Sequence, residues 1–347
     1  MRKFKVGSFF LITSLMILLT ACQTNTSIKA SPQVQMQNQI TGMESQITQA
    51  EQSNLLNLAA STAKEPGSWE FFGKKAVSIS GSTALEINLY PSLDQDVHLQ
   101  VQNNADAVIK SALSQEALAL NIQTKNPVKV KVYLPTQTQY LKLEGMTGVF
   151  AQGLNHIIYL NLKNCNQVNF DIQNWMLEFL ILDQDRNVQL ANLNTPYLLA
   201  DIHNTNQVKL LGHMNLRELK VDHTENLQAY WLNSPILNLT LADNSHVFLA
   251  GKVTMLNATL KNHAQLSAEY LRTDRVFVNT HQTAVAKVAP LTTLNALAED
   301  DSRIYYYHQP QILSRYYHGD GSILYMGDMV PPCHLAFCLT TMRFVPG

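Results

Sequence analysis

Five aspartates in the middle of the chain have the residue type and spacing from which acid–base chemistry on a glycan could be built. Asp183 and Asp185 lie two residues apart, and Asp201, Asp222 and Asp243 follow at steps of about 21 residues. Hydrolysis of a glycosidic bond needs two carboxyl groups roughly 5–9 Å apart. Acidic residues at the corners of a repeat recur in the same way without acting as pairs. A carbohydrate-active enzyme therefore stays an alternative, and no catalytic residue is assigned.

Five histidines recur in the same part of the chain and are expected along one corner of a repeat. A metal-binding ladder would need its imidazoles at one register, but these positions wander by several residues. The pattern favours solvated turn residues, so no metal site and no cofactor are expected. The five are His203, His223, His246, His263 and His281.

Two of the four cysteines lie close together near the end of the sequence. Cys333 and Cys338 follow Pro331-Pro332, and in an oxidising compartment a disulfide between them could close a small loop. A metal site is the alternative, with only His334 nearby as a further ligand. Cys165 is expected to be a small core or turn residue without chemistry.

Six tyrosines are concentrated between residues 305 and 325 and form the candidate binding surface. Tyrosine combines an apolar face with a polar tip, a composition favoured at recognition surfaces. The alternative is that they cover the end of a hydrophobic column, which every repeat protein must cap. Both interpretations stay open for Tyr305, Tyr306, Tyr307, Tyr316, Tyr317 and Tyr325.

The N-terminal residues indicate export. A basic segment, Arg2–Lys5, precedes the apolar stretch Phe9–Leu19, which is short for a membrane-spanning helix. The following Leu19-Thr20-Ala21-Cys22 resembles the lipobox of bacterial lipoproteins. That resemblance implies removal of residues 1–21 as a signal peptide and acylation of Cys22.

The lipobox resemblance also implies a location. Gln23 follows the cysteine in place of the aspartate that retains lipoproteins in the inner membrane, so the expected location is the outer membrane. The folded part would face the periplasm or the exterior, and the lipid on Cys22 would be its membrane attachment. Cleavage leaves 22 basic against 26 acidic residues, a net charge of about −4, which disfavours nucleic-acid binding.

An aliphatic residue recurs every 19 or 20 residues over almost half of the chain. Such a period is typical of a stacked, solenoid architecture. The recurring positions are Val149, Val168, Val188, Val208, Leu227, Val247, Leu266, Val285, Ile304 and Ile323.

A second apolar pair precedes each following anchor by eight and six residues, which predicts two short strands per repeat. Leu160/Leu162, Leu180/Leu182 and Leu239/Leu241 are examples, and Asn, Asp, His, Gln, Ser and Thr fill the corners between strands. Short strands with polar corners predict an all-β, single-chain parallel β-helix with about 19–20 residues per coil over residues 136–328. Lys287 lies where this pattern expects an apolar residue.

Period-2 alternation predicts further strands in an N-terminal β region, residues 69–135. They are Val77–Ile79, Leu85–Leu89, Val97–Val101, Leu118–Ile122 and Val128–Val132. Residues 22–68 are rich in Gln, Asn, Ser and Thr. This composition is typical of a tether, mostly flexible or weakly helical, with sparse helical spacing between Val34 and Leu58. Residues 329–347 form a C-terminal tail.

These features together resemble the head GIN domain, a domain of unknown function in the family of putative auto-transporter adhesins. The likeness covers residues 69–327, from Val77-Ser78-Ile79-Ser80-Gly81 to Gly319-Asp320-Gly321-Ser322-Ile323. It implies a right-handed parallel β-helix on the cell envelope and supplies no catalytic residues. One departure is that this chain uses Asn, Gln or His at corners where the family often has Gly or Ser.

The expected function is therefore that of a lipid-anchored envelope protein with a non-catalytic, adhesin-like role. Its partners would be the membrane, through Cys22, and a glycan or protein ligand. Two alternatives stay open: a polysaccharide lyase or hydrolase on the same scaffold, and a structural component that self-associates into homo-oligomers.

Overall fold

The computed structural model describes residues 32–52, 68–82, 84–102 and 107–328. The proposed signal peptide, Cys22, Cys333 and Cys338 lie outside these residues. The chain divides into two compact units, residues 1–44 and 45–347. One helix, α2 (Pro32–Gln52), contributes to both. Within the described residues, no helix has the length and hydropathy needed to span a bilayer.

The first strands of the second unit follow the predicted alternation of apolar and polar residues. All five predicted N-terminal strands are present, while β1 and β5 have less regular alternation and were not predicted. Together they are β1 (Ser68–Phe72), β2 (Ala76–Gly81), β3 (Leu85–Pro91), β4 (Asp96–Gln102), β5 (Val108–Leu113), β6 (Ala117–Gln123) and β7 (Val128–Leu134).

The repeats then form two strands per coil, as predicted. The first coils use separate short strands: β8 (Tyr140–Glu144), β9 (Gly148–Gln152), β10 (Tyr159–Lys163), β11 (Gln167–Trp175) and β12 (Phe179–Asp183). Later strands run through one corner without a break: β13 (Asn187–His203), β14 (Gln207–Asp222), β15 (Asn226–Ala242), β16 (His246–Leu260), β17 (Gln265–Thr280) and β18 (Val285–Glu299). The last are β19 (Arg303–Tyr306), β20 (Ile312–His318) and β21 (Ser322–Tyr325).

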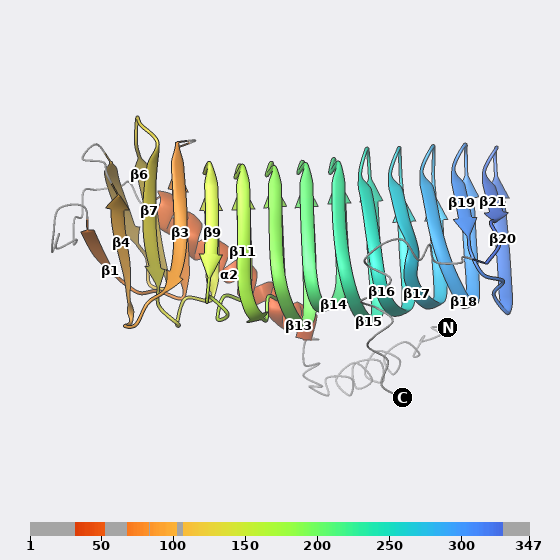
Figure 1. Ribbon diagram of the computed structural model, residues 1–347, viewed down its shortest axis with the longest axis horizontal. Coiled ribbons are helices and arrows are strands. Elements are labelled where there is room, and N and C mark those ends of the chain that lie inside the picture. The colour runs from red at the N-terminus through yellow and green to blue at the C-terminus, as the bar shows by residue number, and fades with distance from the viewer. Residues whose placement is uncertain (1–31, 53–67, 83, 103–106, 329–347) are drawn as a thin grey trace, which may run out of the picture. The chain divides into compact units, whose positions relative to one another are not determined.

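Each coil pairs in parallel with the next, so equivalent residues stack in columns (Figure 1). Leu160 is opposite Leu180, and Leu180 is opposite Ala200. Val168 is opposite Val188, which is opposite Val208. The prediction of a parallel β-helix with coils of 19 or 20 residues is thus confirmed over this stretch.

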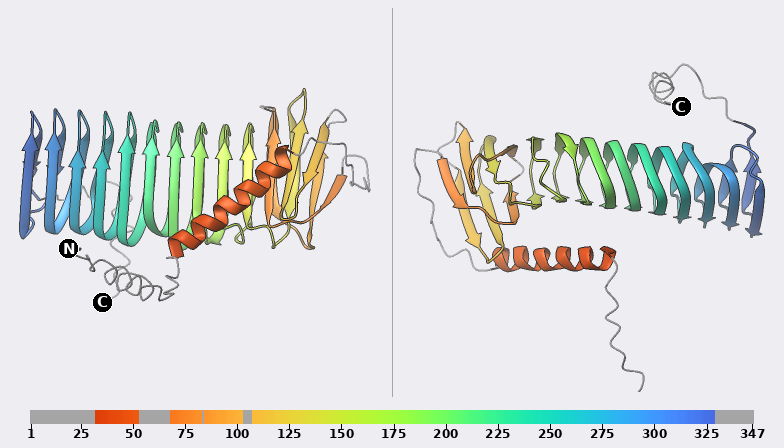
Figure 2. Two further views of the ribbon diagram at one scale, coloured as in Figure 1. Left: turned by 180° about the vertical axis from the view of Figure 1, so that it is seen from behind. Right: turned by 90° about the horizontal axis from the view of Figure 1, so that it is seen from below.

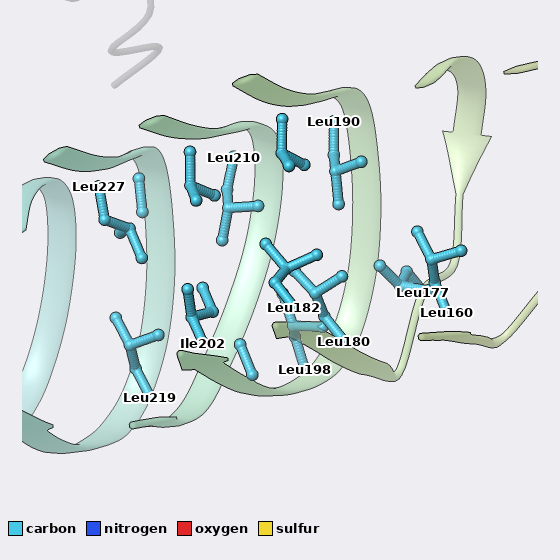
Figure 3. Packing of buried hydrophobic residues seen from close by; sticks show 14 of the residues in the cluster. Leu160, Leu177, Leu180, Leu182, Leu190, Leu198, Ile202, Leu210, Leu219 and Leu227 are labelled. Atoms are coloured by element: carbon cyan, nitrogen blue, oxygen red, sulfur yellow. The ribbon is translucent and has the colours of Figure 1, made fainter. Parts of the chain in front are cut away.

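The stacked aliphatic residues fill the interior of the coils. The anchors and the second pairs predicted from the sequence are buried, with Val285 the exception. In Figure 3, Leu180, Leu190 and Leu210 point into the space that successive coils enclose. Burial of this continuous apolar column, at about 25 cal/mol per Å² of apolar surface, is the main favourable contribution to folding.

One anchor was assigned one residue too early. Leu266 pairs with Ala286, and Ala286 pairs with Ile304, so Ala286 and not Val285 points inward. Lys287 consequently faces outward, between the buried Ala286 and Val288. Because side chains alternate between the faces of a strand, the one-residue shift removes the apparent contradiction.

A left-handed residue ends the same strand in every coil, and we call the turn that begins there the first corner. Gly145 is the first residue of this column along the chain and Gly319 is the last. The coils between them have residues at this position that tolerate positive φ. The column contains Asn164, Gln184, Asn204, His223, Asp243, Asn262, Gln282 and Asp300, with φ between 44° and 62°.

Side-chain hydrogen bonds along the first corner explain why amides can replace glycine there. Asn262 Nδ2 donates to Asp243 Oδ1 at 2.6 Å, and Asn204 Nδ2 donates to Asp183 Oδ1 at 3.2 Å. Backbone groups also connect the coils, since the Asn164 N–H donates to the Asp183 carbonyl at 3.0 Å. These contacts offset the strain of the left-handed conformation.

The N-terminal strands enter the β-helix out of chain order. Strand β2 lies between β6 and β8, and β3 lies between β7 and β9. Beyond β6 and β7 the pairing is antiparallel: β5 pairs with β6, β4 with β7 and β1 with β4. Figure 2 shows these strands at the end of the solenoid opposite β21. They cover sheet edges that would otherwise be open to pairing with another chain.

The last turns of α2, which belong to the second unit, attach to the outer face of β2 and β8. Glu51 accepts a hydrogen bond from Ser78 Oγ at 2.8 Å and forms an ion pair with Lys142 Nζ at 2.8 Å. The outward-facing rings of Tyr140 and Tyr159 stack with their centroids 3.9 Å apart, and both are buried.

Substitution of Leu239 by Asp tests the inward column. Leu239 on β15 is 2% exposed, so an unpaired buried carboxylate there should lower the free energy of unfolding by several kcal/mol, about 3–5. Thr240→Asp, at the adjacent exposed position, is the matched control and should cost less than about 1 kcal/mol. Thermal or denaturant unfolding followed by circular dichroism measures both, and equal stabilities would place Leu239 outside the core.

Candidate functional site

An acidic and histidine-containing ladder lies beside the first corner, and its centre is His203. His203 Nε2 contacts Asp201 Oδ1 at 2.8 Å, and Nδ1 contacts Asp222 Oδ2 at 2.9 Å. Both ring nitrogens thus face carboxylates, an arrangement satisfied best by the doubly protonated imidazolium. Partial burial lowers the pKa of His203, but the hydrogen bond to Asp222 and the nearby carboxylates outweigh it and raise the pKa above its usual 6.5.

The remaining predicted histidines occupy the same corner at different registers. His223 is within 3.3 Å of Asp243, and His281 contacts Glu299. His246 begins β16, and His263 lies in a turn. Across the described segments, no three His, Cys, Asp or Glu side chains are grouped to hold a metal ion. The ladder is a series of histidine–carboxylate contacts along one edge.

Asp185 differs from the other predicted aspartates because it is completely buried. The backbone N–H of Cys165 donates to Asp185 Oδ1 at 2.7 Å, while Oδ2 has no hydrogen-bond partner among the residues that the structure describes. Burial raises the pKa of Asp185 to about 7 and that of the Cys165 thiol to about 12. Asp185 cannot reach an external glycan, so Asp183 and Asp185 do not present two exposed carboxyl groups side by side.

The six predicted tyrosines do not share one surface. Tyr306 is buried and packs against the tilted ring of Tyr325, with centroids 5.3 Å apart. Tyr317 and Tyr325 occupy inward positions of the last described coil, yet are 50% and 45% exposed. Tyr316 faces outward on β20.

Tyr305 and Tyr307 lie on the other side of the coil, on and just after β19. There they join aromatic residues that the sequence reading did not single out. Tyr305 follows Lys287, Ser267 and Phe248 in one outward column. Burial, Glu269, Tyr270 and Tyr305 raise the pKa of the Tyr307 phenol, which places these groups near one another.

We call this group the aromatic surface. Trp231, Phe248 and Tyr270 are each about 40% exposed, and all members belong to neighbouring strands from β15 to the end of β19. Rigid aromatic side chains on a continuous sheet supply contact area at a low cost in conformational entropy. The surface consists of Tyr230, Trp231, Phe248, Tyr270, Tyr305 and Tyr307.

A second corner, opposite the first, positions Trp231. From β9 to β16, the left-handed residues here are Gly153, Asn174, Asn192, Gly212, Trp231 and Gly251. At Gly212 a Cβ atom would lie 2.2 Å from the Leu193 carbonyl oxygen, and at Gly251 it would lie 2.3 Å from that of Leu232. A tryptophan flanked by glycines 19 and 20 residues away is the sequence signal that could have identified this surface.

Among solved structures, the chain is similar to three distant proteins. A putative adhesin from Parabacteroides merdae is 14% identical, with a TM-score of 0.39 over 76% of this chain and 95% of that chain. A putative lipid binding protein from Parabacteroides distasonis is 13% identical, with a TM-score of 0.39 over 77% and 98%. A putative adhesin from Bacteroides fragilis is 17% identical, with a TM-score of 0.31 over 76% and 96%.

Sequence comparison gives a family match that covers most of the β-helix. Residues 76–310 match the family described as putative auto-transporter adhesin, head GIN domain. No curated protein matches the chain. The match runs from the first strand of the solenoid, β2, to just before its last coil.

The buried carboxyl of Asp185 predicts a stability that falls as pH rises. Its folded pKa of about 7 exceeds the unfolded value of 3.8, so between these values the folded state binds more protons and stability declines until it levels off above about pH 7. Asp185→Asn keeps an acceptor for the Cys165 N–H and should stabilise the protein at pH 8 by on the order of 2–4 kcal/mol.

Denaturant unfolding from pH 4 to 8 measures this effect. Asp183→Asn removes a partly exposed carboxylate two residues away and should keep the wild-type pH dependence. An Asp185→Asn protein with the same pH profile as wild type would contradict a protonated, buried Asp185.

Proposed function

Because the chain belongs to the putative auto-transporter adhesin family with a head GIN domain, we propose that it is a lipid-anchored cell-envelope protein with a non-catalytic, adhesin-like binding role. The observation that carries the binding role is the aromatic surface on β15–β19. It presents large rings on neighbouring hydrogen-bonded strands, and such a preformed surface limits the conformational cost of ligand binding.

The architecture favours contact with an extended partner. Coils stack at about 4.8 Å per step, so ligand-contacting side chains repeat along a straight face and not around a concave pocket. A polymer or a second surface can bind along such a face through several weak contacts, and their combined affinity exceeds that of any single contact. This geometry supports adhesion to a macromolecule.

Lipid anchoring is supported by the lipobox-like Leu19-Thr20-Ala21-Cys22. Several acyl chains would hold the protein in the membrane, where a single chain gives only reversible binding. Residues following the anchor, up to the first solenoid strand at Ala76, would separate the β-helix from the lipid surface. Outer-membrane location, facing the periplasm or the exterior, is the expected consequence of Gln23.

Cys22→Ser should abolish incorporation of labelled palmitate and move the protein from the membrane fraction to the soluble fraction. Cys165→Ala is the control, because that thiol is buried and cannot be acylated in the folded chain. Retention of the Cys22→Ser protein in membranes at wild-type levels would refute anchoring by this residue. Protease treatment of intact cells then distinguishes an external from a periplasmic orientation.

The binding role predicts attachment without turnover. Beads carrying the full mature protein should adhere to envelope material, and Tyr305→Ser with Tyr307→Ser should reduce retention about tenfold through loss of aromatic contacts. Tyr316→Ser, at a more exposed tyrosine of the opposite face (63%), is the control and should change little.

Two outcomes of the same experiments would favour the other candidate functions. Release of reducing ends from a glycan, lost on Asp183→Asn or Asp201→Asn, would identify a carbohydrate-active enzyme. Defined oligomers in analytical ultracentrifugation, with no ligand retained on beads, would identify a structural component that self-associates.

A further inference from the structure

Two β-bulges bring large aromatic side chains toward one small residue, Ala250 on β16. On β15 the register shifts between Ala229 and Leu232, so that Tyr230 and Trp231 together oppose Ala250. On β17 a second shift pairs Ala250 with Tyr270. The aromatic residues therefore flank Ala250 from the coils on either side, two strand spacings or about 10 Å apart. Bulges commonly re-aim side chains in this way near functional sites.

Trp231 is held in a conformation that a bulky residue rarely adopts. Its φ is 61°, and the equivalent corners of the preceding and following coils are occupied by Gly212 and Gly251. The neighbouring glycines have no side chains that could cover the indole, which is 40% exposed. A strained backbone that keeps an aromatic ring at the surface, where glycine or asparagine would fit without strain, indicates a function for that ring.

Two cations lie directly beside these aromatic residues. Lys252 follows Gly251, Arg272 follows Leu271, and the two pair across adjacent strands. Both are exposed, and one strand spacing, about 4.8 Å, separates their backbones. Like charges on adjacent strands repel each other, and a bound anion would relieve the repulsion.

Neither cation makes an ion pair with a residue that the structure describes. The acidic residues nearest in sequence, Glu269 and Asp274, do not neutralise them in this way. Other described lysines do form ion pairs, as Lys129 does with Glu86 and Lys220 with Glu218. The second corner thus combines exposed rings with two positive charges that no described residue pairs.

We propose that this corner, formed by Tyr230, Trp231 and Tyr270 with Lys252 and Arg272, binds a carboxylate-bearing oligosaccharide. The inference rests on the proposed function and specifies its ligand class. A sugar ring presents a C–H face that packs on an aromatic ring. Its carboxylate accepts charge-assisted hydrogen bonds from Lys252 and Arg272.

Charge complementarity favours an acidic over a neutral glycan, because no described residue forms an ion pair with either cation. The aromatic rings favour a sugar over a simple polyanion, whose binding would need only charge. Neutral hydrogen-bonding groups suited to hydroxyls also lie at this corner, since Asn233 pairs with Lys252 and Thr254 follows Val253. The mature chain's net charge of about −4 opposes non-specific capture of polyanions.

Calorimetric titration of the full mature protein with uronic-acid oligosaccharides tests the proposal. The probes are oligogalacturonate and oligoalginate, and carboxyl-reduced neutral oligomers of the same length are the comparison. The acidic oligomers should bind about tenfold or more tightly than the neutral ones, and their affinity should fall with added salt.

Variants separate the two parts of the site. Trp231→Asn, a residue already present at the equivalent corner as Asn192, should weaken binding of both oligomer types about tenfold. Lys252→Gln with Arg272→Gln should remove the preference for acidic oligomers. Lys220→Gln and Phe277→Ser, on the other face of the coil, are the controls, and circular dichroism confirms that every variant keeps its fold.

Three results would overturn the proposal. One is the absence of binding to any of the acidic oligomers. Another is an affinity for dextran sulfate equal to that for the acidic oligosaccharides, unchanged by Trp231→Asn. That result would show that charge attraction alone accounts for binding. The third is binding to phosphatidylglycerol vesicles lost in the same variants, which would assign the corner to a lipid surface. In each case the bead assay with Tyr305 and Tyr307 variants still decides the broader binding role.

Discussion

The whole structure depends on parallel, in-register hydrogen bonding between successive coils. Each position of a coil must lie opposite the equivalent position of the neighbouring coils, as Leu160, Leu180 and Ala200 do. This requirement fixes which side chains point inward, keeps the apolar column continuous, and makes the first corner repeat its left-handed residue. Stability is then close to a sum of contributions from each coil and its interfaces. A buried polar residue must therefore find hydrogen-bond partners in its own or the adjacent coil. Asp185 does so with only one of its two carboxylate oxygens among the described residues.

The same constraint explains where variation is tolerated. The first corner is a turn of constant length, and its amide and acidic side chains hydrogen-bond from coil to coil. The second corner instead contains bulges, where one strand has an extra residue and the ladder is locally interrupted. Exposed aromatic residues and two exposed cations are found at the second corner and on the adjoining face. The solenoid thus serves as a rigid scaffold, and its second corner can vary. Binding loops on other folds are supported by a rigid framework in the same way.

Sequence patterns located the candidate site only in part. Tyr305 and Tyr307 were recognised because tyrosines are dense in that segment, but Tyr306 in the same run is buried. Alternation along a strand places neighbours on opposite faces, so local density cannot distinguish a surface from a core. Trp231 was missed because its significance comes from glycines one coil away on each side. The histidines lie at or beside the first corner, but Asp201 lies within β13, and the burial of Asp185 could not be read from its spacing.

The sequence by itself determined the period, the inward columns, the polar corners and the all-β class, because these follow from local alternation of side chains and from turn-forming residues. Only the tertiary structure decided the pairings between distant segments. Val77 lies between Leu118 and Leu141, and no local pattern specifies that order, since any apolar strand can pair with any other. The same is true of Ala286, which replaces Val285 as the inward residue. Register over bulges is set by hydrogen bonds to the neighbouring coil, and these exist only once the coils are stacked.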